Sequence, residues 1–577
     1  MSKHEVVIRV GGAAGDGIAS TGESFAKICS RSGLHLLAYN SYQSVIRGGF
    51  IYLQLRAGRD KILSHGNKVD FLIALNPLEF QRNIVDVVSG GAVLYNSDKI
   101  KPDPDKVPND VILCPLPVNE ILNDIGRNPI LQNTVALSSL VQLLDLDVDV
   151  MNSVIRDYFG KKKQSVMEIN LKVIKAGYEY SKSNLPDFDF DLNPDYNIKR
   201  PVLTGNQALG FGSILAGCKF YCAYPMTPAS SILHYLIAQS KKSGMVVKQA
   251  EDEISVINMA IGSSFAGVRS MVGTSGGGFA LMTEAIGLAG QTETPIVVIN
   301  SMRGGPSTGL PTKTEQGDLF QAIGASQGDF PKVIIAPSTI EDCFYSTIEA
   351  FNLADQFQIP VIILSDLFLS EHMESIDDLD FNSTIERGEI VTSNDSDKPY
   401  RRFQYTDTGV SPRAFPGTFG TVFQASSDEH DDYGNIISDV FTDSETRTKI
   451  MLKRMRKMKF IEEQLPSAKL EGPADADLTI VSWGSTYNVV HEAVQILQNN
   501  SKSVNHLHIK YLIPLQKEIK EILSNSKDTL IIEANYTGQL SKLISMETGF
   551  QINHTLFKYD GEPFYPEQII DKVEDLI

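Results

Sequence analysis

Short apolar runs, separated by stretches with helical periodicity, fill the first third of the chain. Hydrophobic side chains recur every three or four positions in 18–30, which predicts an amphipathic helix. Apolar runs with the length of buried strands lie at 6–10, 36–39, 51–55, 71–75, 92–95 and 111–114. Because strands that alternate with helices are typical of α/β sheets, we expect an α/β domain over residues 1–184.

The same alternation resumes twice further along the chain. A stretch near 185–200, rich in Asp, Asn and Pro, indicates a linker. A second unit begins at 202–206, with further strands expected at 219–223, 246–247, 270–272, 295–300, 332–336 and 360–366. A third unit has expected strands at 479–482, 506–509 and 529–533. The pattern predicts a doubly wound domain at 196–375 and an α/β domain at 471–577, joined by an excursion and connecting segment at 376–470.

One strand-to-loop crossing in the second unit, Tyr224-Pro225-Met226-Thr227-Pro228-Ala229-Ser230, is stiffened by its two prolines. They fix φ at two positions and force Met226 and Thr227 away from helical geometry. Helical periodicity follows at 230–240, so Thr227 should lie at the carboxyl end of a strand, just before a helix. Open α/β sheets bind ligands at such places. An ordinary stiffened turn has the same pattern, and this heptapeptide alone leaves both alternatives open.

Two further strand ends in this unit carry charged side chains. Glu253 follows the strand at 246–247 and precedes a helix expected at 254–265, and Arg303 follows the strand at 295–300. A glycine loop, Thr274-Ser275-Gly276-Gly277-Gly278, lies between them in sequence. Because parallel strands end at the same edge of a sheet, the side chains of Thr227, Glu253 and Arg303 should converge.

These three side chains suit a small 2-oxoacid lying against an organic cofactor. Burial of Glu253 would raise its pKa and let it exchange a proton with a heterocycle. Arg303, followed by two glycines, can present its fork to a carboxylate, and Thr227 can donate to a carbonyl oxygen. Taken singly, Glu253 is better explained as a helix N-terminal charge and Arg303 as an exposed ion pair. The glycine loop, too, could serve only sheet-to-helix packing.

The first strand runs into a second glycine loop, 11–17, whose backbone N–H groups could face an anion. A nicotinamide or flavin fingerprint would place an acid at the end of the second strand, where Tyr39-Asn40-Ser41 stands instead. Gly15-Asp16-Gly17 with Asn40 imitates the magnesium–diphosphate motif of thiamine enzymes, although the gap is short. A structural or substrate-cofactor loop is favoured over both. Arg47 could meet an anion or cap a turn, and our hypothesis is that Arg47 and this loop face the active-site cleft.

Composition narrows the classes of function. A net charge of −18 over 577 residues argues against non-specific nucleic-acid binding, and the one basic run, 453–459, is better explained as a helix face. The chain has no apolar stretch of spanning length and no signal-peptide core at its start, so we expect a cytoplasmic protein without a membrane partner.

Cysteines and acids give no convincing metal site. The five cysteines lack a repeated CxxC spacing, so neither a disulfide framework nor a four-thiolate cluster is indicated, and Cys218 and Cys222 should be core residues. The run Asp428-Glu429-His430-Asp431-Asp432 could hold a metal, but a lone histidine among exposed acids usually marks a solvated loop. We expect no metal ligands in this chain.

The proline motif, Glu253 and the run Arg303-Gly304-Gly305-Pro306-Ser307-Thr308-Gly309-Leu310-Pro311-Thr312 together resemble the alpha subunit of the 2-oxoacid:ferredoxin oxidoreductases. Met226 replaces the isoleucine more common in the motif, a change that conserves volume. The resemblance extends over nearly the whole chain. It implies an N-terminally fused gamma domain at 1–184, a thiamine-diphosphate pyrimidine-binding-type domain at 196–375 and a transketolase C-terminal-like domain at 471–577.

In this family thiamine diphosphate lies between two chains. The resemblance implies that Glu253 contacts the aminopyrimidine ring, that Arg303 binds the substrate carboxylate and that Thr227 binds the substrate. The remaining expected contacts are Arg47 to substrate and Pro225, Thr274, Ser275 and Gly276 to cofactor. Mg²⁺ and the [4Fe–4S] cluster would belong to a separate beta subunit, ferredoxin would accept the electrons and coenzyme A the acyl group. The chain should therefore be inactive alone.

Alternatives are open both for the identity of the substrate and for the activity. The fused gamma–alpha arrangement favours 2-oxoglutarate slightly over pyruvate, and an indolepyruvate or 2-oxoisovalerate version is a rival. A catalytically silent scaffold or regulatory chain is a rival from another class, against which the joint presence of Thr227, Glu253 and Arg303 counts. An independent dehydrogenase that uses the first glycine loop is a weaker third.

Overall fold

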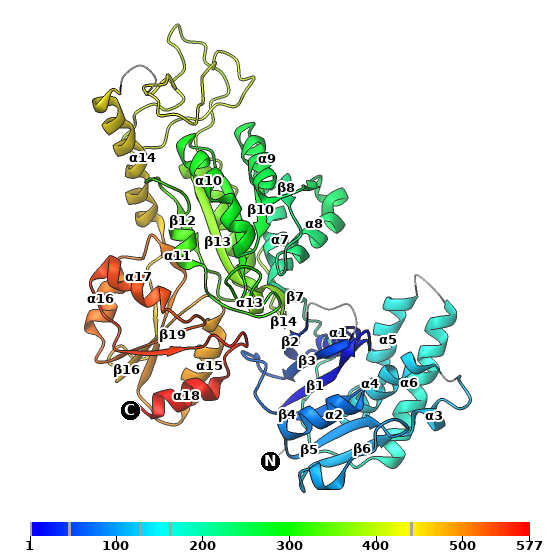
Figure 1. The fold of residues 1–577 in the computed structure, drawn as a ribbon. Coiled ribbons are helices and arrows are strands. Elements are labelled where there is room, and N and C mark those ends of the chain that lie inside the picture. Colours follow the sequence, from blue (N-terminus) through cyan, green and yellow to red (C-terminus); the bar gives the residue numbers. More distant parts are fainter. Residues whose placement is uncertain (1–2, 44–47, 127, 161–163, 439–441) are drawn as a thin grey trace. The chain divides into compact units, whose positions relative to one another are not determined.

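The computed structural model describes residues 3–43, 48–126, 128–160, 164–438 and 442–577 (Figure 1). The chain folds into two compact units. Unit 1 comprises Met1–Thr204 with Glu371–Leu379, and unit 2 comprises Gly205–Ser370 with Asp380–Ile577. Both units consist of sheets covered by helices, which confirms the expected α/β class.

An eight-stranded sheet with the order β6-β5-β4-β1-β3-β2-β14-β7 forms the centre of unit 1. Its strands are β1 (Glu5–Ala14), β2 (His35–Ser41), β3 (Gly48–Gly58), β4 (Val69–Ala74), β5 (Val87–Asn96), β6 (Ile112–Leu116), β7 (Val202–Thr204) and β14 (Met373–Ser375). Successive side chains of a strand point to opposite faces. In β1, accordingly, Val6 and Ile8 enter one hydrophobic core and Val7 enters another.

Helices cover both faces of this sheet. The larger core takes residues from α1 (Ile18–Arg31), α3 (Val118–Ile121), α4 (Gln132–Leu143), α5 (Val148–Phe159) and α6 (Gln164–Asn184). On the other face, Phe80 of α2 (Pro77–Asn83) packs with Val7 and with residues of β4 and β5.

The strand expected to open the second unit belongs to the first. Residues 202–204 form β7, which pairs antiparallel with β14, and β14 pairs antiparallel with β2. The hydroxyl of Ser375 also accepts a hydrogen bond of 2.9 Å from the backbone N–H of Leu36. Our placement of 202–204 was wrong because a three-residue strand has no periodicity, and its partner lies about 170 residues further along the chain.

A seven-stranded sheet with the order β18-β12-β13-β11-β10-β8-β9 runs through unit 2. It contains β8 (Phe220–Ala223), β9 (Val246–Gln249), β10 (Ser270–Thr274), β11 (Ile296–Met302), β12 (Val333–Ile335), β13 (Pro360–Asp366) and β18 (Tyr511–Ile513). All neighbours are parallel except β12 and β18. The connecting helices are α7 (Gly205–Leu215), α8 (Ser230–Ser243), α9 (Glu253–Phe265), α10 (Gly276–Gln291), α11 (Leu319–Ile323), α12 (Ile340–Phe357) and α13 (Leu367–Glu371).

The C-terminal part of unit 2 adds a five-stranded sheet with the order β15-β17-β16-β19-β20. Its strands are β15 (Leu470–Glu471), β16 (Leu478–Trp483), β17 (Val504–Ile509), β19 (Thr529–Glu533) and β20 (His554–Phe557). Its helices are α15 (Thr486–Asn499), α16 (Glu518–Asn525), α17 (Gln539–Thr548) and α18 (Pro566–Glu574). One hydrophobic core contains Val298 of β11 together with Trp483 and Ile509, so the two sheets of unit 2 share a core.

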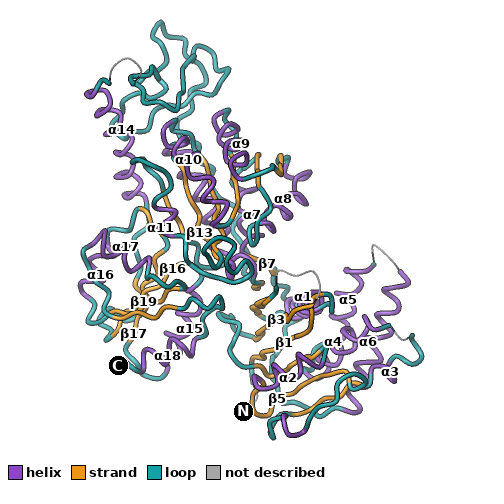
Figure 2. Tube along the Cα trace, viewed as in Figure 1, coloured by secondary structure: helices purple, strands orange, loops and turns teal. Residues whose placement is uncertain are grey.

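The described residues of 376–443 run mostly as loop and lead into α14 (Ser444–Gln464) (Figure 2). The basic run at 453–459 is helical as expected, but Lys453 and Lys457 are buried and both pair with Glu293 at 2.6 Å. The expectation of a solvated loop at 428–432 is wrong for its histidine. His430 is buried, because its ring packs on Phe403 with the ring centroids 3.8 Å apart.

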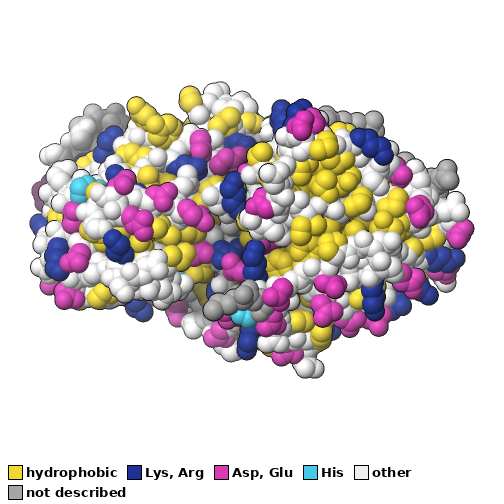
Figure 3. Space-filling view, turned by 90° about the horizontal axis from the view of Figure 1, so that it is seen from below, with side chains coloured by type: hydrophobic (Ala, Val, Ile, Leu, Met, Phe, Trp, Pro, Cys, Tyr) yellow, Lys and Arg dark blue, Asp and Glu magenta, His cyan; other side chains and the backbone are white. Residues whose placement is uncertain are grey.

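The remaining sequence features concern the thiols and the surface. All five cysteines are buried as free thiols, which confirms the expectation that Cys218 and Cys222 are core residues. Of the helices that the structure describes, none combines the length and the apolar character needed to cross a bilayer. On the face drawn in Figure 3, acidic and basic side chains lie interspersed.

Candidate active site

The proline-stiffened turn follows β8 directly. Its Thr227–Pro228 peptide bond is cis, and α8 begins two residues after Pro228. The side-chain amide of Asn206, buried in α7, donates a hydrogen bond of 2.9 Å to the carbonyl oxygen of Pro228. Thr227 is half-buried at the carboxyl end of β8, the position expected from the sequence.

Glu253 is the first residue of α9 and is only 3 % exposed. The carboxylate of Asp252 caps this helix by accepting a hydrogen bond of 2.8 Å from the N–H of Ser255. The Oγ1 hydroxyl of Thr274 lies 3.5 Å from Oε1 of Glu253, at the limit of a hydrogen bond. Burial raises the pKa of the Glu253 carboxyl, in the direction that the sequence predicts, and the hydrogen bond from its own backbone N–H and the contact with Thr274 oppose the rise only in part.

The glycine loop between β10 and α10 lies against this glutamate. A Cβ atom on Gly278 would collide with Oε1 of Glu253 and with Oγ1 of Thr274. Ser275 precedes α10 as its N-cap residue, and its buried Oγ has no hydrogen-bond partner among the described residues. A buried hydroxyl at a helix N-terminus needs a polar partner, so this loop can receive a polar or anionic group.

Arg303 follows β11 and reaches across to the proline turn. Its Nη1 donates a hydrogen bond of 2.8 Å to the carbonyl oxygen of Thr227. Oγ1 of Thr274 in turn lies 3.9 Å from the sulfur of Met226. Thr227, Glu253, Thr274 and Arg303 therefore form one connected group at the carboxyl ends of β8, β10 and β11 and the start of α9.

Two carboxylates that sequence reasoning missed lie near Arg303 and the two glycines that follow it. Asp318 accepts a hydrogen bond of 3.1 Å from Nδ2 of Asn300, and Glu315 accepts one from the backbone N–H of Gly305. Burial raises the pKa of both carboxyls, although the hydrogen bond from Asn300 and the charge of Arg303 oppose the rise at Asp318. They lie in the loop between β11 and α11, which has no hydrophobic periodicity to reveal its path.

Not all expected contacts are placed. Pro225 lies in the turn and is exposed. Gly276, the first residue of α10, faces the carboxylate of Asp318, with which a Cβ at this position would clash. Arg47 lies outside the described residues, so its contact with substrate and the hypothesis that it faces the cleft stay predictions.

In the N-terminal glycine loop, the side chain of Asp16 makes structural hydrogen bonds. Oδ2 of Asp16 accepts hydrogen bonds from the N–H of Ala13 at 2.8 Å and from Nδ2 of Asn76 at 3.3 Å. The same loop is held from α4, because Nδ2 of Asn133 donates to the carbonyl oxygen of Asp16 at 2.7 Å. A carboxylate that closes its own loop is a poor magnesium ligand, which favours the structural interpretation of this motif.

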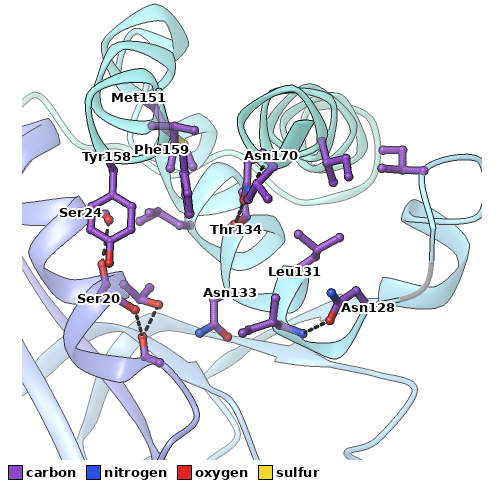
Figure 4. A pocket seen from close by; sticks show the side chains of 18 of the residues that line it. Ser20, Ser24, Asn128, Leu131, Asn133, Thr134, Met151, Tyr158, Phe159 and Asn170 are labelled. Atoms are coloured by element: carbon purple, nitrogen blue, oxygen red, sulfur yellow. Dashed lines mark hydrogen bonds between the residues drawn. The ribbon is translucent and has the colours of Figure 1, made fainter. Parts of the chain in front are cut away.

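A cavity of about 650 Å³ opens beside this loop within unit 1 (Figure 4). Helices α1, α4, α5 and α6 line it. Apolar and polar side chains share the wall, among them Ser20, Ser24, Leu131, Asn133, Thr134, Met151, Tyr158, Phe159 and Asn170. Figure 4 shows a hydrogen bond between Thr134 and Asn170, which measures 2.9 Å. This cavity could not be predicted from the sequence, because four separate helices contribute to its lining.

Comparisons with known proteins define the class. The family model described as pyruvate flavodoxin/ferredoxin oxidoreductase, thiamine diphosphate-binding, matches residues 211–449, and that described as pyruvate ferredoxin/flavodoxin oxidoreductase matches residues 7–180. The alpha subunit of a 2-oxoacid:ferredoxin oxidoreductase from Sulfolobus sp is 32 % identical over 97 % of this chain and 95 % of its own. The chain therefore belongs to the alpha subunits of the 2-oxoacid:ferredoxin oxidoreductases, with an N-terminally fused gamma domain.

Two further relatives are named for one substrate, 2-oxoglutarate. The KorA subunit of 2-oxoglutarate oxidoreductase from Mycobacterium tuberculosis is 31 % identical, over 93 % of this chain and 86 % of its own. A solved 2-oxoglutarate:ferredoxin oxidoreductase from Magnetococcus marinus, with 2-oxoglutarate, coenzyme A and succinyl-CoA bound, superposes with a TM-score of 0.93 at 33 % identity and covers all of both chains.

Proposed function

We propose that this chain, together with a beta subunit, catalyses the coenzyme A-dependent oxidative decarboxylation of a 2-oxoacid, with 2-oxoglutarate preferred over pyruvate. The products are acyl-CoA and CO₂, and the electrons pass through a beta-subunit iron–sulfur cluster to ferredoxin. The observation that carries this proposal is the connected group formed by Thr227, Glu253, Thr274 and Arg303 at the strand ends. The preference for 2-oxoglutarate rests on the two relatives named for it.

The residues of this group fit thiamine diphosphate, which when bound acts as an electron sink for decarboxylation. Glu253 is buried with a raised pKa, which favours its protonated form and suits it to exchange a proton with a ring nitrogen. The unpartnered Oγ of Ser275 and the start of α10 offer donors to polar atoms of the cofactor. Gly276 leaves the space in front of the Asp318 carboxylate clear of side chains, and Gly278 does the same for Glu253.

Substrate binding falls to Arg303 and Thr227. The hydrogen bond to the carbonyl oxygen of Thr227 fixes the guanidinium at the strand ends, where it can pair with a substrate carboxylate. Thr227 adds a hydroxyl for the 2-oxo group. Removal of the Arg303 guanidinium should raise the KM for the 2-oxoacid more than a substitution in the proline-stiffened turn does.

Exposed apolar side chains near this group support a partner chain. Large hydrophobic residues are exposed on α8, α9, α10 and the edge strand β9, namely Ile237, Val246, Ile254, Met259 and Leu281. Ile254 directly follows Glu253, so a chain that covered these residues would also close the site. We assign Mg²⁺ and the [4Fe–4S] cluster to that beta subunit, and this chain should be inactive without it.

The cavity of unit 1 is our candidate for part of the coenzyme A site. Its walls combine aromatic and aliphatic side chains with hydroxyl and amide groups, a mixture that suits an amide-containing aliphatic chain. Gly15 and Gly17, both with positive φ, place backbone at its edge, where no side chain blocks an approaching ligand. Replacement of Tyr158 by Ala should raise the KM for coenzyme A without changing that for the 2-oxoacid.

The test uses the chain purified with the beta subunit from its own cells. Bleaching of the iron–sulfur absorbance is followed after addition of 2-oxoglutarate or pyruvate, with and without coenzyme A. Glu253→Gln should lower the rate at least about 100-fold, as for loss of a proton-transfer group, whereas Glu251→Gln, an exposed neighbour, should match the wild type. Unchanged bleaching by Glu253→Gln would favour the silent-scaffold alternative, and faster bleaching with pyruvate would reverse the substrate preference.

A further inference from the structure

A group of imidazoles and one carboxylate lies in the C-terminal five-stranded sheet, where the proposed reaction has no use for it. Glu471 of β15 is directly opposite His506 of β17 in the antiparallel register. His491 reaches the same place from α15. Nδ1 of His491 is 2.9 Å and Nδ1 of His506 is 3.8 Å from Oε2 of Glu471, and one ligand atom from each residue lies within 4.8 Å of the other two.

Neighbouring hydroxyl and imidazole groups orient His506. Its Nε2 is 2.6 Å from Oγ of Ser482, and that oxygen is 2.9 Å from Nδ1 of His508. A serine hydroxyl carries one proton. If Nε2–H of His506 donates to Ser482, then Ser482 donates to His508, and Nδ1 of His506 keeps a lone pair. The opposite tautomers would leave Nδ1–H facing Glu471 at a separation too long for a good hydrogen bond.

The buried Nδ1 of His506 therefore lacks a partner. His506 is fully buried, and this atom has no hydrogen-bond partner among the described residues. A lone pair that faces a carboxylate is unfavourable unless a cation lies between them.

We propose that Glu471, His491 and His506 bind a divalent transition-metal ion of the zinc class. Two imidazole nitrogens and one carboxylate form a ligand set that Zn²⁺ accepts, with a fourth position for water. Tetrahedral zinc with nitrogen and oxygen ligands separates them by about 3.3 Å, and the observed 2.9 and 3.8 Å lie on either side of that value. The side chains of Glu471 and His491 are 39 % and 29 % exposed, so the ion and its water can enter from solvent.

The surrounding groups complete the site. The hydroxyl of Tyr487 donates to Oε1 of Glu471 at 2.9 Å, which leaves Oε2 for the ion. The ring of Tyr487 stacks against those of His491 and His506, with centroids 5.5 and 5.4 Å away. Gln495 lies 2.9 Å from Nε2 of His491, and its amide oxygen, once turned inward, accepts that N–H. The bound ion joins β15, β17 and α15, and so stabilises the C-terminal sheet.

The test uses the full chain, freed of any affinity tag and treated with a chelator. Co²⁺ serves as the spectroscopic probe and Zn²⁺ as its competitor. We expect one Co²⁺ per chain with the intense visible bands of tetrahedral coordination, loss of these bands on addition of Zn²⁺, and a Tm that rises with Zn²⁺. Glu471→Gln and His491→Gln should weaken binding at least about tenfold and abolish the Tm shift.

The matched control is His554→Gln. His554 pairs with Asp528 at 2.9 Å in the same sheet and with similar exposure, but it belongs to no three-ligand group in the described residues. This variant should bind Co²⁺ as the wild type does. Because the two partly exposed ligands carry the test, it does not depend on a folded His506 variant. Absence of Co²⁺ binding by the wild type, or equal binding by Glu471→Gln and His491→Gln, would overturn the proposal.

Discussion

Two buried glutamates of unit 2 differ in their interaction partners. Glu293, in the loop after α10, pairs with Lys453 at 2.6 and 2.8 Å and with Lys457 at 2.6 Å. The carboxylate of Glu253 is contacted by its own backbone N–H and by the hydroxyl of Thr274, at 3.5 Å. Burial raises the pKa of both carboxyls, but the cations around Glu293 reverse the effect and hold its pKa below the usual range, whereas that of Glu253 stays raised. Burial alone therefore does not decide the direction of a carboxyl pKa shift; the presence or absence of neighbouring cations does.

The largest expected effect comes from removing the paired carboxylate. Glu293→Gln leaves two lysine ammonium groups buried without their counter-charge, which should cost roughly 3–5 kcal/mol in the free energy of unfolding. Denaturant unfolding, followed by hydrogen exchange in α14, measures the loss. Glu445→Gln, which breaks the exposed pair with Lys449 in the same helix, should match the wild type within error. A Glu293→Gln variant as stable as the wild type would show that the pair has no structural role.

In contrast to Glu293→Gln, the substitution Glu253→Gln should lower turnover and leave stability intact. Turnover should fall at least about 100-fold, equivalent to about 2.7 kcal/mol in the activation barrier, while the free energy of unfolding at neutral pH is not lowered. With a raised pKa, the folded protein keeps a proton that the unfolded chain releases above its ordinary pKa, so Glu253 makes stability fall as pH rises above about 4.5. Glu293, with a lowered pKa, makes stability fall as pH drops below about 4.5.

Unfolding curves measured at several pH values separate the two glutamates. Glu253→Gln should remove the loss of stability above pH 4.5, and Glu293→Gln should remove the loss below it. Turnover of the complex, measured on the same preparations, shows whether the reactive carboxyl is the unpaired one. A Glu253→Gln variant that loses stability at neutral pH would mean that this carboxyl, too, is held charged by partners.

The surroundings of Glu253 could be predicted in part from the sequence, whereas the ion pairs of Glu293 could not. Thr227, Glu253 and Arg303 each follow an apolar run, and parallel strands must end at one edge, so their convergence could be inferred without coordinates. The pairs of Glu293 lie 160 and 164 residues away in a helix whose basic residues look solvent-facing in sequence. No local pattern reports contacts over such distances.

The same limit explains the other surprises. Glu315 and Asp318 lie in a loop without periodicity, and the cavity of unit 1 is assembled from four helices. Glu471 is placed opposite His506 by strand register, which depends on pairing between segments 35 residues apart.

Close contact with the glycine loop offers a sharper test of the geometry around Glu253. Gly278→Ala would push a methyl group into Glu253 and Thr274, which should cost about 1–3 kcal/mol in stability and lower turnover. Gly277→Ala is the matched control, because no described atom outside the loop lies within 4 Å of its Cβ position. In a helix that exchange should be neutral or stabilising by up to about 1 kcal/mol. Thermal unfolding and turnover of both variants check the pair, and equal behaviour would contradict the contact.

The smallest effect is expected at the cap of α9. Asp252→Ala removes the oxygen that accepts the N–H of Ser255 at 2.8 Å and should lower the free energy of unfolding by about 1 kcal/mol. Because Glu253 is the next residue, fraying of this turn should also lower turnover, though less than Glu253→Gln does. Asp252→Asn keeps a capping oxygen and should restore both quantities. Hydrogen exchange in the first turn of α9 separates the two effects: if Asp252→Ala lowers turnover while that turn stays protected, Asp252 acts on the reaction through its charge and not through the position of Glu253.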